Sequence, residues 1–170
     1  MAAPLFSQNV HRYDPYRTFK FQVAIEGVVI AGLSKMTALK KTVEVSPWKA
    51  AGDPFSHQRM IPGGTSYEPI TLEAGLTHDK QLMNWANLVN NLDGDGGMSL
   101  KGFRKDLSIN VLNMQGVVAL SYNVKRAWVS EFQALPEMDA NAMNVIGIQS
   151  VTLQHEGFSF SDQYAEPVET

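Results

Sequence analysis

The pattern that most restricts the fold of this chain is a strict alternation of large apolar residues with small or polar ones after residue 17. The apolar positions are Phe19, Phe21, Val23 and Ile25. Successive side chains of a strand point to opposite faces, so these four share one face of an extended segment. Gly27 then ends the pattern. We therefore expect a strand with one apolar and one wet face.

Similar strand patterns recur along the chain, separated by turn residues. They cover residues 28–33, 42–46, 67–74, 107–114, 117–125, 127–132 and 144–155. Gln115-Gly116 predicts a hairpin turn, and 127–132 is either a further strand or a continuation of the hairpin. The last strand is expected to end at Glu156-Gly157. Several short strands with turns between them predict a mainly β sandwich or barrel.

One segment shows helical spacing instead. Thr77 is a good N-cap, and Asp79 in the first turn suits the helix dipole. The apolar positions that follow are Leu82, Trp85, Ala86 and Val89. Residues 93–97 are expected to stop this short helix. Trp85, and Trp128 in a later strand, fall in apolar patterns and are expected in the core.

The segment between Pro47 and Gly64 is rich in residues that break regular structure. They are Pro47, Gly52, Pro54, Pro62, Gly63 and Gly64. They argue against a helix or a central strand, so we expect a long loop over residues 47–66. The loop nevertheless keeps Trp48, Phe55, Met60 and Ile61. Disordered segments are poor in such residues, so we expect another surface to bury them.

Composition excludes several classes of protein. A length of 170 residues fits a single domain over 1–170, with an N-terminal arm at 1–17 and a C-terminal tail at 159–170. The absence of cysteine excludes disulfides, thiolate metal sites and a cysteine nucleophile. With 14 Lys and Arg against 17 Asp and Glu, nonspecific DNA binding is disfavoured. No apolar run approaches the ~20 residues of a membrane span, and residues 1–16 lack a conventional signal peptide.

Residue types that carry chemistry do not assemble into a site. Residues 91–96 resemble the start of a calcium loop, but its twelfth position is Gly102 where a bidentate Glu is required. Ser46 and Lys49 match an S-x-x-K motif, but Pro47 prevents the helical turn that this chemistry needs. The four histidines show no metal-ligand spacing. We therefore expect no catalytic residue, cofactor site or metal site, and no enzyme activity.

Four lysines make the segment before the long loop locally basic. They are Lys35, Lys40, Lys41 and Lys49. Two interpretations remain open: a solvated strand end, or a contact with acidic groups of another subunit.

The order of the segments resembles the tail tube protein family of contractile phage tails and related contractile injection systems. The matching stretches are Asp14-Pro15-Tyr16-Arg17, Phe19-Lys20-Phe21, residues 61–67, Ile70-Thr71-Leu72, Trp85, Lys125-Arg126-Ala127-Trp128 and residues 153–158. The loop departs from the family pattern, since Gly64 replaces Leu and Ser66 replaces Lys, which leaves the loop's own partner open.

The resemblance implies two packed antiparallel sheets with one short helix, and hexameric rings that stack head to tail into a rigid tube inside a contractile sheath. Trp48, Phe55, Met60 and Ile61 are then candidates for contacts between rings. Thr18, Lys20 and Gln22 are candidates for the wall of a polar, not strongly basic lumen. Alternatives are a baseplate-proximal tube initiator and a secreted hexameric ring protein of the type VI secretion kind.

The resemblance also implies the partners and the location. Besides further copies of the chain, the expected partners are the sheath protein, baseplate and tube-initiator proteins, and a tail terminator or cap. DNA or effector cargo would pass through the lumen without specific binding. The protein would be made in the cytoplasm and act inside the sheath of an assembled particle.

Overall fold

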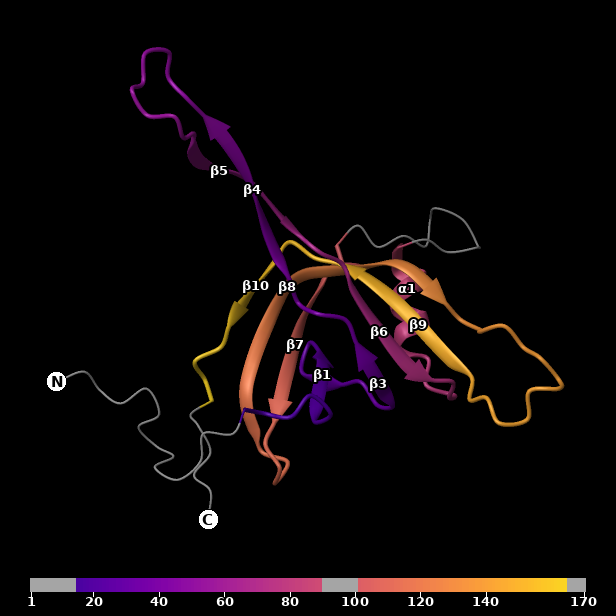
Figure 1. The fold of residues 1–170 in the computed structure, drawn as a ribbon. Coiled ribbons are helices and arrows are strands. Elements are labelled where there is room, and N and C mark those ends of the chain that lie inside the picture. Colours follow the sequence, from indigo (N-terminus) through magenta and orange to yellow (C-terminus); the bar gives the residue numbers. More distant parts are fainter. Residues whose placement is uncertain (1–14, 90–100, 165–170) are drawn as a thin grey trace.

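The computed structural model describes residues 15–89 and 101–164, and within these ranges the chain forms ten strands and one helix (Figure 1). The elements are β1 (Phe21–Ile25), β2 (Val28–Val29), β3 (Leu33–Met36), β4 (Lys41–Trp48), β5 (Arg59–Tyr67), β6 (Ile70–Gly75), α1 (Gln81–Val89), β7 (Lys105–Leu112), β8 (Val118–Gln133), β9 (Ile148–Gln154) and β10 (Gly157–Phe160). The expected helix stop at 93–97, the calcium-like segment 91–96 and most of the N-terminal arm lie outside the described residues.

Eight strands form one antiparallel sheet that bends along its longest strand, β8. Its order is β2-β1-β7-β8-β9-β6-β3, with β10 also paired to β8, while β4 and β5 form a separate two-stranded sheet. The first half of β8 pairs with β7 and β10, and its second half pairs with β9. Arg126 lies between the halves with φ 52°, an uncommon conformation for a residue with a Cβ. The bend brings the apolar faces of the halves together and confirms the expected mainly β fold with one helix.

The core lies between the two halves of the bent sheet and under the helix. Its buried members are Val23, Ile25, Ile30, Ile70, Leu72, Ala74, Leu82, Trp85, Leu107, Ile109, Val124, Ala127, Val129, Val151 and Leu153. The alternation expected in the first strand holds from Phe21 to Ile25. Phe19 lies before β1 and is 64% exposed, so the pattern begins one step later than expected.

The helix begins later than its sequence pattern suggested. Asp79 Oδ1 accepts a 3.0 Å hydrogen bond from the backbone N–H of Gln81, and Thr77 Oγ1 accepts one from the N–H of Asp79. Asp79 therefore caps the helix, and Thr77 stabilises the turn before it. None of the described residues belongs to a helix long and apolar enough to cross a membrane.

Several strand boundaries differ from the expectation, and residues 28–33 do not form one strand but contain β2 and the start of β3. The hairpin of β7 and β8 is confirmed, and residues 127–132 continue β8. The final strand is shorter than residues 144–155, since β9 starts at Ile148. The tail expected at 159–170 overlaps β10, which extends to Phe160 and pairs with the first half of β8. Residues 165–170 of this tail lie outside the described residues.

Candidate functional site

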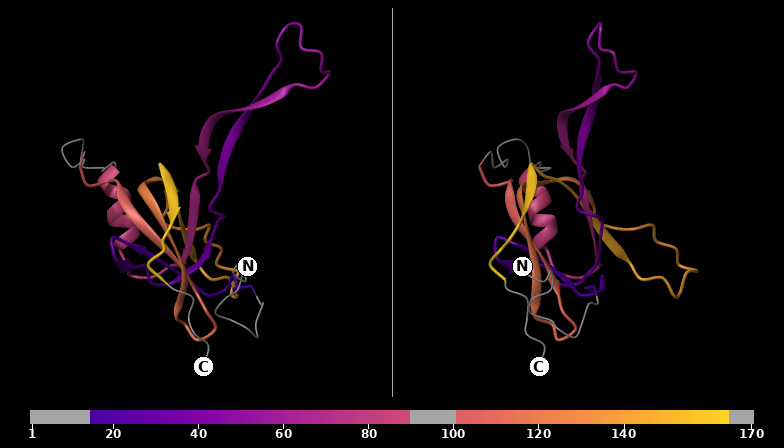
Figure 2. Two further views of the ribbon diagram at one scale, coloured as in Figure 1. Left: turned by 90° about the vertical axis from the view of Figure 1, so that its left-hand side faces the viewer. Right: turned by 60° about the vertical axis from the view of Figure 1, so that its left-hand side comes forward.

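The segment expected to be a long loop is a β-ribbon that extends from the body, here called the arm (residues 41–67; Figures 1 and 2). In the arm β4 pairs with β5, and residues 49–58 form the tip. Two residues of β5, Gly63 and Gly64, stand opposite the single residue Glu44, which is a β-bulge. A Cβ on Gly63 would lie 3.3 Å from the carbonyl oxygen of Glu44, so glycine permits this close approach. Pro62 is tolerated because each strand of a two-stranded ribbon has an open edge.

The arm exposes large apolar side chains on both faces and at its tip. Their exposed fractions are Val43 40%, Val45 61%, Trp48 49%, Phe55 60%, Met60 67% and Ile61 46%. The pairing puts Val45 and Met60 on one face, and Trp48 and Ile61 on the other. All four residues expected to contact another ring are thus brought onto one projecting element. Val43 and Val45 extend this surface and were not among the candidates, because their strand gave no sign that both faces stay open.

An aromatic cluster fixes the arm to the body at its base. The ring of Tyr67 lies 5.5 Å from that of His155 and 5.9 Å from that of Phe158. His155 Nε2 donates a 3.0 Å hydrogen bond to the carbonyl oxygen of Glu68. Gly157 lies beneath Tyr67 with φ 147°, and a Cβ there would meet the Tyr67 ring at 3.3 Å. Lys40 Nζ and Glu68 Oε1, 2.5 Å apart, link the two chain segments that enter the arm.

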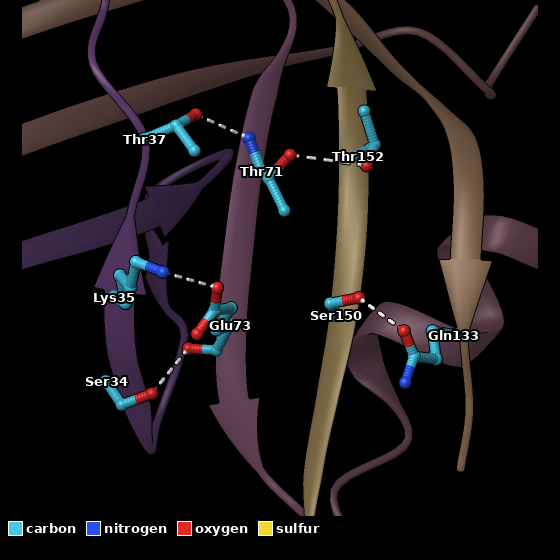
Figure 3. A network of polar contacts seen from close by, with 8 residues as sticks. All are labelled: Ser34, Lys35, Thr37, Thr71, Glu73, Gln133, Ser150 and Thr152. Atoms are coloured by element: carbon cyan, nitrogen blue, oxygen red, sulfur yellow. Dashed lines mark hydrogen bonds and ion pairs between the residues drawn. The ribbon is translucent and has the colours of Figure 1, made fainter. Parts of the chain in front are cut away.

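A second surface is the outer face of β3, β6, β9 and the second half of β8, here called the polar face (Figure 3). It bears Ser34, Lys35, Thr37, Thr71, Glu73, Gln133, Ser150 and Thr152. Thr71 Oγ1 lies 3.3 Å from Thr152 Oγ1, and Ser150 Oγ donates to Gln133 Oε1 at 3.4 Å. Lys35 Nζ and Glu73 Oε1 form an ion pair of 2.9 Å, and the exposed Glu131, which stands opposite Thr152, adds one negative charge to this face. The opposite face of the same strands supplies the core, as strand alternation requires.

The residues expected to line a lumen do not share one strand face. Thr18 is exposed and precedes β1, and the Lys20 ammonium donates a hydrogen bond to the carbonyl oxygen of Met114. Gln22 is half-buried on the outer face of β1. That face is already covered in part, since Ser121 two strands away is 2% exposed.

The two tryptophans expected in the core differ in position. Trp85 is 2% exposed, and its Nε1–H donates a 2.7 Å hydrogen bond to the carbonyl oxygen of Phe103. Trp128 is half-buried outside the core cluster and packs edge to face with the Phe103 ring. Ala127 and Val129 point into the core, so the residue between them points outward.

Charged residues cluster at the bend of β8, where they bind the backbone and one another. Asp106 Oδ1 accepts a 2.9 Å hydrogen bond from the backbone N–H of Arg126. This bond lowers the pKa of Asp106 most, against a smaller opposing effect of burial, and the positive charge of Lys125 also lowers it. Glu156 lies 3.6 Å from Arg104 and 3.3 Å from Arg126. Within residues 15–89 and 101–164, no group of three or more His, Asp or Glu residues could hold a metal ion.

The model of the T4-like virus tail tube protein family, gp19, matches residues 17–159. The chain belongs to this family. The resemblance noted from the sequence is thereby confirmed, and the protein is a tail tube protein. A search of curated proteins by sequence found no match.

Solved structures share the fold of this tail tube protein at low sequence identity. A chain in the cap that terminates the anti-feeding prophage tube is 20% identical, with 93% of this chain and 98% of that chain covered and a TM-score of 0.74. A chain in the extended sheath–tube complex of the extracellular contractile injection system PVC is 21% identical, with coverages of 91% and 96% and a TM-score of 0.71. A chain in the virion of a native gene transfer agent is 9% identical, with coverages of 86% and 99% and a TM-score of 0.57.

Proposed function

We propose that this tail tube protein forms hexameric rings that stack head to tail into the rigid inner tube of a contractile tail or injection system. The exposed apolar arm carries the proposal. An isolated two-stranded ribbon is marginally stable in water, and every residue of β4 is exposed in the single chain. Open edges with apolar side chains invite pairing with another chain. A neighbouring ring would cover the arm and hold it in place.

Ring closure is supported by two of the unpaired strand edges in the described part of the chain. These are the outer edge of β3 and the edge of β8 beyond Ala127. The alternating directions of β3, β6, β9 and β8 make β3 antiparallel to β8. Copies related by rotation about a ring axis keep the same orientation. The β3 edge of one copy can therefore pair antiparallel with β8 of the next, and the sheet continues around the ring.

The polar face is the wall that we assign to the lumen. Serine, threonine and glutamine side chains, one compensated ion pair and Glu131 give a polar surface that is not basic. A basic wall would hold DNA through phosphate contacts and slow its passage. Thr18, Lys20 and Gln22 stay a separate prediction for the lining.

The partners follow from this role. A sheath protein would surround the tube, baseplate and initiator proteins would begin it, and a terminator or cap would end it. Sheath contraction would drive the tube through a target envelope, and DNA or effector proteins would pass through its lumen. The assembled particle is then the place of action, and the protein is a structural component without enzyme activity.

Electron microscopy of the purified protein tests the stacking role of the arm. The test variant replaces residues 49–58 by Asn-Gly, a two-residue hairpin turn that keeps the strands paired. Rings without long tubes are the expected result. The control replaces Val28 and Val29, exposed residues of β2, by threonine, and it should form tubes like the parent. Tubes of unchanged length from the arm variant would contradict the proposal.

A further inference from the structure

The loop between β8 and β9, residues 134–147, is a second apolar surface that the body of the protein does not cover. Leu135, Met138, Met143, Val145 and Ile146 are 62–92% exposed. The loop is nevertheless held by hydrogen bonds within it and to the body. Asn141 N–H donates to Asp139 Oδ1 at 2.9 Å, and the carbonyl oxygen of Gly147 accepts from Leu76 N–H at 2.9 Å. A shaped loop with this much exposed apolar area marks a binding surface.

The arm of the same chain does not cover this loop. The two elements leave the body in different directions in the views of Figures 1 and 2. The protein therefore presents two separate apolar surfaces, and both are open in the single chain.

The charges of the two surfaces are opposite. The loop contains Glu137 and Asp139 but no Lys or Arg. The arm near its tip carries Lys49 and Arg59 against one acid, Asp53, which lies 3.8 Å from Arg59. Complementary charges set the register of apolar contacts and disfavour pairing of like surfaces. Arm-to-arm and loop-to-loop contacts are less favourable than an arm against a loop.

The loop also holds a cavity of about 330 Å³ that can receive an aromatic side chain. Its lining is mixed, with Pro136, Met138, Val145 and Ile146 as apolar residues and Glu137 and Asp139 as acids. Phe55 at the arm tip is 60% exposed, and its ring makes a tilted contact with His57.

We propose that the arm of one copy docks on the β8–β9 loop of a second copy, with an aromatic side chain of the tip in this cavity. The inference rests on the proposed stacking role of the arm and names its receptor. The two surfaces differ, so the contact is heterologous, and each copy offers a free arm and a free loop to the next. Such a contact extends an assembly without closing it on itself.

Disulfide trapping tests this contact, and the natural chain has no cysteine to interfere. Phe55→Cys and Val145→Cys are made in separate chains of different size, one of them tagged. The chains are mixed, assembled and oxidised. The control pairs Phe55→Cys with Met114→Cys, because Met114 is 58% exposed in the turn between β7 and β8. Two thiols that docking keeps adjacent react at a much higher effective concentration than thiols that meet by diffusion. We therefore expect the disulfide yield of the Phe55–Val145 pair to exceed that of the control on the order of tenfold.

The outcomes separate the two proposals. A Phe55–Val145 disulfide in tubes supports both. Tubes in which Phe55 links to Met114 instead, or to neither cysteine, overturn the arm–loop contact and leave the tube proposal standing. The disulfide without tubes supports the contact and counts against stacking into a tube. If neither tubes nor the disulfide forms, both proposals are overturned.

Discussion

Asp106 holds the backbone of Arg126 at the bend of β8, where its Oδ1 accepts a 2.9 Å hydrogen bond from the Arg126 N–H. The bend turns one strand into a member of both halves of the sheet, because the β8 pairs with β7 and β10 lie before it and the pairs with β9 lie after it. At the bend Arg126 adopts a φ of 52°, which is unfavourable for a residue with a Cβ. A carboxylate of one strand thus stabilises the conformation that shapes the whole core.

The stability of the protein should depend on the charge of Asp106. Its pKa in the folded state is lowered from 3.8, mainly by the Arg126 N–H. A lowered folded pKa gives stability that is present above the unfolded value and lost as the pH falls through the folded value. Asp106→Ala should lower the free energy of unfolding by about 1 kcal/mol at pH 7, since the group is half exposed. Urea unfolding of the unassembled protein at pH 7 and pH 3 measures this.

Asp106→Asn is the control for that experiment. The amide oxygen can still accept the bond, but it does not titrate. The difference in stability between the parent and Asp106→Asn should shrink at pH 3. A difference that stays constant with pH would show that the charge of Asp106 has no role.

Gly157 should contribute to stability where the arm joins the body. Gly157→Ala adds strain at φ 147° and a contact of 3.3 Å with Tyr67, whereas Gly116→Ala adds strain at φ 87° with no atom within 4 Å. Each strained residue costs on the order of 1–3 kcal/mol, and the Tyr67 contact adds to this only at Gly157. Unfolding curves should show a larger loss for Gly157→Ala.

A double-mutant cycle isolates the contact with Tyr67. In a Tyr67→Ala background the excess cost of Gly157→Ala over Gly116→Ala should disappear, because the ring is gone. An excess that persists would assign the cost to the backbone alone.

Trp85 and Trp128 should contribute unequally to stability. Trp85→Phe removes ring volume from the core and leaves the carbonyl of Phe103 without its donor, a loss of about 1–3 kcal/mol. Trp128→Phe keeps an aromatic ring against Phe103 on the outer face and should cost below about 1 kcal/mol. Denaturant unfolding compares the two variants, and equal losses would contradict the assignment of only Trp85 to the core.

The body of the fold could be predicted from local patterns. In β6, Ile70 and Leu72 alternate with Thr71 and Glu73, and this alternation alone assigns a buried and a wet face. Gln115-Gly116 likewise marks the β7–β8 turn. Both signals depend only on residues that are close in sequence, so they can be recognised without knowing the fold.

The arm, β10 and the face of Trp128 depend on distant partners. The glycines at 63–64 become a bulge only because Glu44 stands opposite them, and β10 is a strand only because β8 pairs with it. Trp128 points outward because the other half of the sheet covers the opposite face of β8, and the sequence of β8 alone does not say which face is covered. The apolar β8–β9 loop was missed because its Val145 and Ile146 fit the start of a strand as well as a loop.

The face of the arm that bears Val45 and Met60 should be necessary for tube formation. Replacing Val45 and Met60, which are 61% and 67% exposed, by threonine and glutamine should abolish long tubes while the unfolding free energy stays within about 0.5 kcal/mol. The side chains are already in water in the single chain, so only an assembly can lose their burial. Negative-stain microscopy and sedimentation measure the tubes. A variant with normal tubes would exclude this face of the arm from the contact between rings.

Chemical labelling of assembled tubes can decide which residues line the lumen. Lys35→Cys places a thiol on the polar face, and Thr18→Cys places one at a position of the earlier prediction. A small maleimide diffuses into the bore, whereas a maleimide on a polymer wider than the bore does not. If the polar face forms the wall, Lys35→Cys in tubes should react with the small reagent and resist the large one.

Unassembled protein is the control, because both positions are exposed there and both reagents should react. The Lys35 side chain is 65% exposed in the single chain, so protection from the large reagent would come from assembly. If Thr18→Cys alone shows the size-selective reaction, the lumen is lined by the segment before β1 and the polar face lies elsewhere. If Lys35→Cys reacts with both reagents in tubes, the polar face lies on the outside, and the sheet of β3, β6, β9 and β8 does not enclose the channel.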